Sequence, residues 1–233
     1  MTHRWLSGLT ASILLLGCAG EAAWSDTERL RQKASEAVAN HQSATARKIL
    51  REALAKESPA LSRDQRAAAA DLRRELAGID VSMDDLGDAE RLYREALTLL
   101  LQPPAGSTEA LINLRTQLAG ICYRQGRLAE AAEFYREVLK LETATLGAEH
   151  PDVLNTLSIL GGLELKLGRR AEAEILFRRQ LVVAQRLPGA EKREAATVLD
   201  NLAEVLEQSG RLVEAAECRA QAKQIRHNLC DEC

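Results

Sequence analysis

Residues 111–139, LINLRTQLAGICYRQGRLAEAAEFYREVL, hold the pattern that decides the fold. The first half places apolar residues three or four positions apart, on one face of a helix: Leu111, Leu114, Leu118 and Cys122. Gly126 then interrupts the pattern, as a glycine at a helix C-terminus does. A second apolar face follows: Leu128, Ala131, Ala132, Tyr135 and Leu139. The stretch therefore predicts two amphipathic helices joined by a tight turn.

This helix pair recurs along the chain. Leu-Ala-Gly-Ile at residues 76–79 returns 42 residues later at 118–121, and related tetrapeptides follow at 160–163 and 202–205. The same step connects four alanines of the second helix: Ala89, Ala131, Ala173 and Ala215. It also connects three aromatic residues: Tyr93, Tyr135 and Phe177. A weaker fifth copy lies upstream around Ala34, Ala46 and Leu50. We therefore predict an all-α stack of five helix pairs, ten main helices in all, over residues 27–228.

The five predicted repeats cover about residues 27–57, 61–101, 107–143, 151–186 and 191–228. Ser62 and Gln65 have the spacing of a capping box, and Pro151 suits the first turn of a helix. Copies three to five keep the turn glycine: Gly126, Gly168 and Gly210. His41 and Asp84 replace it in the first two copies.

The pattern resembles the tetratricopeptide repeat. That family has a small residue in the first helix, which is matched here by Ala34, Ala77, Ala119, Gly161 and Ala203. The spacing of 42 residues and the linker LGAEHPDV at 146–153 resemble the kinesin-light-chain subtype. The resemblance implies a right-handed solenoid whose first helices line a concave groove for a protein or peptide segment. It names no partner, because one scaffold of this kind serves many.

Composition excludes several classes of function. Apolar residues make up 46% of the 233 residues, charged residues 28%, and the net charge is -3. A nucleic-acid binder driven by bulk charge, a multi-span membrane protein and a disulfide-stapled mini-protein are all inconsistent with these values. We therefore expect no nucleic acid, and no small-molecule substrate is evident.

The first residues have the features of an export signal. Arg4 precedes the uncharged run LSGLTASILLL at residues 6–16, which is too short to span a membrane. Leu15-Leu16-Gly17-Cys18 resembles a bacterial lipobox, which implies a signal peptide at 1–17, lipidation of Cys18 and a short tether over 18–26. Ala19 is not the aspartate that retains such proteins in the inner membrane, so the resemblance favours the outer membrane and a domain facing the periplasm. Plain secretion, an uncleaved anchor and an intracellular adaptor remain alternatives.

No catalytic constellation is visible. His41, His150 and His227 lack a triad-like setting, and the sequence contains no phosphate-binding glycine loop and no HExxH or GxSxG motif. We therefore predict neither an enzyme nor a cofactor nor a metal site.

The cysteines divide into two groups. Cys122 and Cys218 occupy repeat positions that predict small buried side chains. Cys230 and Cys233 form a CxxC tail at residues 229–233, for which a disulfide is the simplest interpretation. A redox or sensory role of this tail is an alternative, and so is a metal site that includes His227.

The groove positions implied by the family carry polar side chains. We select nine candidates for contact with a partner: Arg74, Asn113, Tyr123, Arg124, Asn155, Lys166, Asp200, Asn201 and Glu204. Asparagine can hydrogen-bond both groups of a bound backbone, and the cations would hold acidic side chains. We therefore expect a negatively charged segment near repeats two to four and a basic end near repeat five.

Three glycines recur in the middle of first helices: Gly78, Gly120 and Gly162. Each should cost about 0.8–1 kcal/mol relative to alanine. Close packing of neighbouring helices would explain them, and so would a smooth floor that a ligand backbone approaches. Taken together, the sequence predicts a membrane-anchored, non-enzymatic scaffold for a protein partner, with a role in envelope assembly.

Overall fold

The structure of the chain is a computed structural model that describes residues 26–57, 61–103, 106–186 and 191–231. Within these ranges, every regular element is a helix and no strand occurs. A helical segment at 26–39 precedes nine labelled helices: α2 (Ser43–Ala55), α3 (Arg63–Ser82), α4 (Leu86–Leu101), α5 (Thr108–Arg124), α6 (Leu128–Leu146), α7 (Pro151–Lys166), α8 (Arg170–Arg186), α9 (Glu191–Gln208) and α10 (Leu212–Asp231). The predicted all-α class and ten main helices are confirmed for the described part of the chain.

The predicted lipidation site and the predicted disulfide concern residues that the structure does not describe. The signal peptide with its lipidation site at Cys18 lies outside the described residues. So do Cys233 and the side chain of Cys230, and the predicted disulfide stays a prediction. None of the described helices combines the length and apolar character that a membrane crossing requires.

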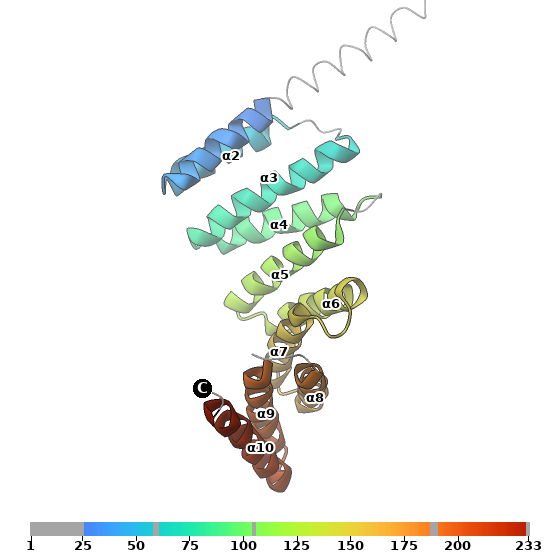
Figure 1. The fold of residues 1–233 in the computed structure, drawn as a ribbon. Coiled ribbons are helices and arrows are strands. Elements are labelled where there is room, and N and C mark those ends of the chain that lie inside the picture. Colours follow the sequence, from blue (N-terminus) through green and yellow to red (C-terminus); the bar gives the residue numbers. More distant parts are fainter. Residues whose placement is uncertain (1–25, 58–60, 104–105, 187–190, 232–233) are drawn as a thin grey trace, which may run out of the picture. The chain divides into compact units, whose positions relative to one another are not determined.

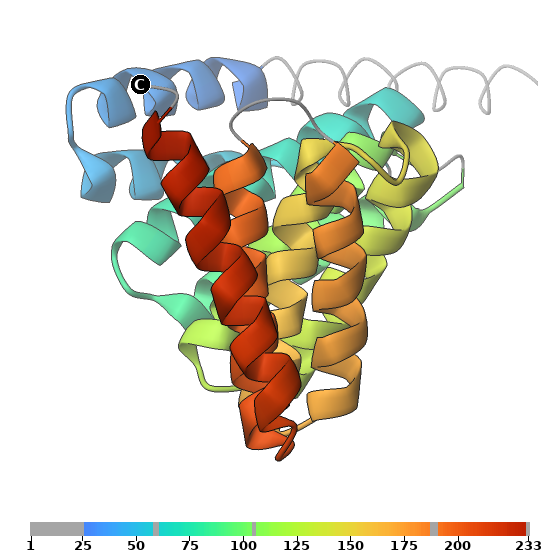
Figure 2. The same ribbon diagram turned by 60° about the horizontal axis from the view of Figure 1, so that its bottom comes forward.

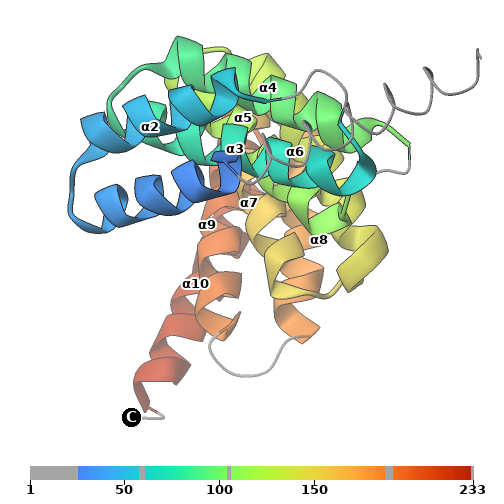
Figure 3. The ribbon, with the colours of Figure 1, turned by 90° about the horizontal axis from the view of Figure 1, so that it is seen from above.

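The chain divides into two compact units between Leu114 and Arg115, within α5. In the first unit, α3 packs against α2 and α4 (Figure 1), and the segment 26–39 lies alongside α2 (Figure 3). In the second unit, α7 packs against α6 and α8, and α9 packs against α8 and α10 (Figure 2). Each unit is therefore a row of helix pairs in chain order.

All five turns within the helix pairs share one geometry. The second residue after each first helix has a positive φ, and two of these five residues are not glycine: His41 (57°), Asp84 (62°), Gly126 (77°), Gly168 (74°) and Gly210 (77°). The next N–H donates to a carbonyl five residues back, from Arg127 to Cys122 at 2.8 Å in the third copy and from Gln42 to Ala37 at 2.9 Å in the first. This bond is typical of a Schellman cap. The turn therefore persists even where its glycine is lost.

Two helices begin at the residues that the capping signals in the sequence predict. Ser62 Oγ accepts the N–H of Gln65, and Gln65 Oε1 accepts the N–H of Ser62, so the predicted capping box is confirmed. Pro151 opens α7 directly after His150, whose Nδ1 accepts the N–H of Asp152 at 3.2 Å. The His150 side chain therefore caps the N-terminus of α7.

The core consists of the small and aromatic repeat positions. The second-helix alanine is fully buried in every copy: Ala46, Ala89, Ala131, Ala173 and Ala215. Phe177 and Tyr93 are buried, while Tyr135 is half-buried. Burial raises the pKa of both tyrosine hydroxyls. Arg219 takes the aromatic position in the last copy, where it is exposed and bound to Glu207 at 2.7 Å, so this position of the final helix is polar.

Three acidic side chains are buried among these helices: Asp80, Glu142 and Glu164. Arg47 Nε lies 2.6 Å from Asp80 Oδ1, yet burial outweighs this contact and raises the pKa of Asp80. The carboxylate of Glu164 contacts Arg136 and Arg169. Asp80, Cys122, Glu164 and Leu206 share one repeat position. Polar and apolar residues therefore alternate at a single core site.

Candidate binding face on the first helices

The exposed side of each first helix, here called the first-helix face, holds the predicted contact residues. In the second unit it carries side chains of α5, α7 and α9: Tyr123, Arg124, Asn155, Lys166, Asp200, Asn201 and Glu204. In the first unit it carries Arg74 on α3 and Asn113 at the beginning of α5.

A cavity of about 360 Å³ opens on this face between α5 and α7. Its walls comprise Gly120, Tyr123, Tyr135, Ser158, Ile159, Gly162, Leu163 and Lys166. The ammonium of Lys166 donates a hydrogen bond to the hydroxyl of Tyr123 and lies 4.7 Å from the centroid of its ring. Tyr123 is nevertheless 45% exposed and Ile159 is 37% exposed. The cavity thus offers an aromatic side chain, an aliphatic side chain and a cation to an incoming ligand.

The recurring glycines form part of this surface. A β-carbon added to Gly120 or Gly162 would meet no atom within 4 Å, and one added to Gly78 would come no closer than 3.9 Å to the Tyr93 hydroxyl. Close packing of neighbouring helices is therefore the wrong explanation for all three. Because a glycine inside a helix costs about 1 kcal/mol relative to alanine, these positions lose stability with no packing contact in return.

The first unit has two cavities on its first-helix face. The larger, about 830 Å³, lies between the segment 26–39 and α3, and Gly78 is in its wall. Arg31 crosses this cavity and donates from Nε to both carboxylate oxygens of Glu75 at 3.0 Å. The smaller, about 280 Å³, brings Arg74 and Asn113 together, and Arg74 is bound there to Asp71 at 3.2 Å. Both arginines are therefore already paired with carboxylates of the chain.

The charges predicted for repeat five are also paired in part. Arg226 of α10 binds the carboxylate of Asp200, and Glu204 accepts a hydrogen bond from Gln208 at 3.2 Å. Asn201 is half-buried and Asn155 is exposed on α7. Of the nine candidates, the structure brings Tyr123 together with Lys166 and Arg74 together with Asn113.

Sequence reasoning missed Ile159. It lies on α7 next to Ser158 and lines the cavity, although leucine and isoleucine residues of this helix are mostly buried. Ile159 lies directly beside the buried apolar stripe of α7. The apolar periodicity of the sequence therefore does not distinguish Ile159 from the core residues.

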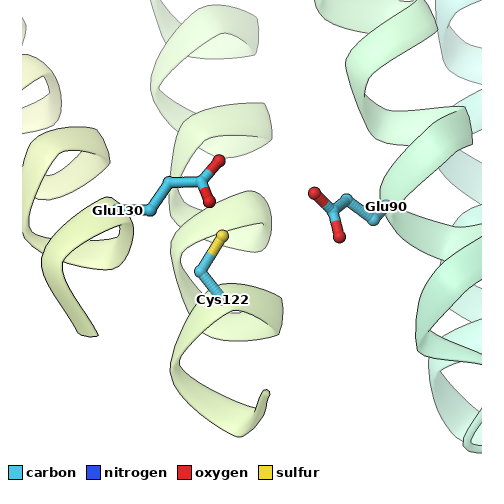
Figure 4. A group of neighbouring side chains, drawn as sticks. All are labelled: Glu90, Cys122 and Glu130. Atoms are coloured by element: carbon cyan, nitrogen blue, oxygen red, sulfur yellow. The ribbon is translucent and has the colours of Figure 1, made fainter. Parts of the chain in front are cut away.

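Cys122 and Cys218 lie in the described part of the chain. Cys122 is fully buried, and Cys218 is a half-buried free thiol that packs against the core and has a pKa raised by burial. Cys122 Sγ and a carboxylate oxygen of Glu130 lie within 4.8 Å of each other (Figure 4). Glu90, also drawn there, belongs to the first unit. Within the second unit, the thiol and one carboxylate are fewer ligands than the three or four protein groups of a zinc site.

Comparison with known proteins identifies the repeat. A sequence model described as "Tetratricopeptide repeat" matches residues 109–181 and 152–226, which together span just over half of the chain. No curated protein sequence matches the chain significantly.

Solved structures share the fold. BtubC (BKLC) from P. vanneervenii is 20% identical, with a TM-score of 0.66 over 97% of this chain and 93% of that one. A Podosopora anserina protein described as a kinesin light chain with nearly identical TPR-like repeats is also 20% identical, with a TM-score of 0.66 over 87% of this chain and 95% of that one. MamA is 11% identical, with a TM-score of 0.59 over 85% of this chain and 96% of that one. At these identities the likeness concerns the fold alone.

Proposed function

The chain belongs to the tetratricopeptide repeat family, and we propose that it is a non-enzymatic scaffold that binds a segment of a partner protein on its first-helix face. Repeats of this family are typical of protein–protein interaction. The observation that carries the proposal is the open space above Gly120 and Gly162, beside the cavity between α5 and α7. A glycine lets a ligand backbone approach a helix more closely than any other residue does.

The side chains on the first-helix face of each unit, taken separately, suggest the chemistry of the partner. Asn113 and Asn155 are exposed and can hydrogen-bond both the N–H and the C=O of a bound backbone. Lys166 and Arg124 favour an acidic side chain in the second unit. Arg74 contributes less than its charge suggests, because Asp71 already binds it. For the same reason, the preference for a basic end near repeat five depends mainly on Glu204 rather than on Asp200.

We further propose that the chain is exported and held on a membrane by lipid attached to Cys18, with a role in envelope assembly. The support is the lipobox-like sequence that precedes Cys18. Cys18→Ser should release the protein from membranes or leave it unprocessed, because serine lacks the sulfur to which the lipid would be attached. Stable anchoring then fails, since it needs more than one acyl chain. An intact residue 1 in the mature protein would contradict this proposal. Secretion without an anchor would instead give a cleaved chain with no incorporated lipid label.

Larger side chains at Gly120 and Gly162, together called the glycine floor, test the binding proposal. The double variant Gly120→Leu with Gly162→Leu should fold, because both positions face open space, and should capture at least about tenfold less partner from cross-linked membranes. Gly87→Leu is the matched control, since Gly87 of α4 also faces open space but lies on a second helix. Cys230→Ser with Cys233→Ser should leave capture unchanged. Loss of capture in that variant would favour the redox or sensory function of the tail.

A further inference from the structure

A second groove lies between the second helices α6 and α8, and it shares no residue with the cavity between α5 and α7. Its volume is about 530 Å³. Aliphatic side chains make up much of its wall: Leu139, Leu160, Ile175 and Leu176. Ile175 is 67% exposed, and Val182 of the same helix is 48% exposed. Two large apolar side chains thus remain in solvent along one helix.

The repeat register shows that this exposure is particular to α8. The position of Ile175 is occupied by a charged residue in every other copy: Lys48, Arg91, Glu133 and Glu217. The position of Val182 is polar or small in the others: Ala55, Thr98, Lys140 and Gln224. A solvated helix face does not need these aliphatic residues, and exposed apolar patches on a folded protein mark interaction sites.

The charges beside the groove select a partner. Lys140 of α6 and Arg179 of α8 line it, and Arg179 donates to the hydroxyl of Thr143 at 3.1 Å. Among the described residues, neither cation is bound to a carboxylate. Arg136 differs, because both Glu133 and Glu164 bind it. Glu172, in the first turn of α8, is an exposed acid that also lines the groove. Besides this acid and the paired Glu164, the groove has an apolar wall and two cations that lack an acidic partner among the described residues.

We propose that this groove binds an amphipathic helix of a partner protein, with an aliphatic face against Ile175 and Leu139 and acidic residues toward Lys140 and Arg179. Val182 lies outside the residues that line the groove, seven residues or about 10.5 Å beyond Ile175 on the same side of α8, and this spacing matches two turns of a bound helix. This surface goes beyond the proposed first-helix face, and either can fail without the other.

Two synthetic helical peptides of about 18 residues test the proposal. Both carry one Leu/Ala face, and the residues flanking that face are glutamate in one peptide and lysine in the other. Fluorescence anisotropy with the full chain should show the glutamate peptide binding at least about tenfold more tightly. Ile175→Glu, which installs the residue of copies three and five, should remove that binding. Val213→Glu is the control, because Val213 is also an exposed apolar residue but lies outside the groove.

Charge reversal completes the test. Lys140→Glu with Arg179→Glu should invert the preference toward the lysine peptide, with an unchanged circular-dichroism spectrum. Filling the glycine floor through Gly120→Leu and Gly162→Leu should leave binding of the glutamate peptide unchanged. The proposal is overturned if the glutamate peptide does not bind, if both peptides bind equally, or if Ile175→Glu binds as the wild type does.

Discussion

A β-carbon built on Gly161 would lie 2.6 Å from Cε1 of Phe177, whereas one built on the next residue, Gly162, would meet no atom within 4 Å. Gly161 therefore makes room for a buried ring of the same repeat. Gly162 makes room for no side chain of the described residues, and it lines the cavity between α5 and α7. Two adjacent glycines thus have different physical reasons, and only the second is available to a ligand.

The two glycines should respond oppositely to alanine. Gly162→Ala should stabilise the fold by about 1 kcal/mol, because alanine has the higher helix propensity. Gly161→Ala should destabilise it by about 1–3 kcal/mol, since the new methyl group displaces the Phe177 ring. Urea denaturation measures both. Equal shifts in the same direction would show that the contact with Phe177 does not control this position.

The buried pair Arg47 and Asp80 gives a second prediction. Arg47→Met should lower stability clearly, because it leaves the fully buried Asp80 carboxylate without its cation. Adding Asp80→Leu should recover most of the loss, since the equivalent position in repeat five is Leu206. Thermal melts of the single and double variants make the comparison. A double variant less stable than Arg47→Met would mean that Asp80 stabilises the fold through other contacts.

Glu142 should make stability depend on pH. Burial raises the pKa of Glu142 above its ordinary value of 4.5, although the Thr156 hydroxyl opposes the shift, and Oε2 has no hydrogen-bond partner among the described residues. The folded state therefore holds this proton more tightly than the unfolded state, and stability falls as pH rises through the raised pKa. Glu142→Gln should stabilise the fold near neutral pH by up to about 1 kcal/mol, with the gain fading toward pH 4.5.

An exposed acid provides the control for this measurement. Glu217→Gln, on the surface of α10, should change stability little at either pH. Equal gains for Glu142→Gln at both pH values would show that burial of the charge is not the cause.

The first turn gives a fourth prediction. His41 has a φ of 57°, which is unfavourable for any residue with a β-carbon. His41→Gly should therefore stabilise the fold by about 1 kcal/mol, and Gly126→Ala, at the equivalent position of repeat three, should cost about 1–2 kcal/mol. Chemical denaturation checks both. A loss of stability in His41→Gly would mean that the imidazole contributes more than the backbone strain costs.

Most of the fold could be predicted because the repeat imposes the same local rules five times. Gly126, Pro151 and the pair Ser62 and Gln65 each mark a helix end by local chemistry, and each occupies the predicted position. The turns at His41 and Asp84 show that the register survives even where the favoured residue is absent.

The candidate site was harder to predict, because exposure and pairing depend on residues distant in sequence. Arg74 and Asp200 have suitable positions, but Asp71 and Arg226 bind them. Whether Gly120 packs or faces a cavity depends on its neighbours in space, and the sequence leaves both explanations open. Ile175 could have been found from the register alone, because the other four copies are charged at that position.

Site-specific photocross-linking in the cells that produce the protein tests the first-helix face most directly. A photoreactive amino acid replaces Ile159, in the cavity wall, or Ala216, which is exposed on the second helix α10. We predict a discrete protein adduct from position 159, none from position 216, and loss of the adduct when Gly120→Leu and Gly162→Leu fill the floor. No adduct at 159, or an adduct that persists at full intensity over the filled floor, would contradict binding on the first-helix face.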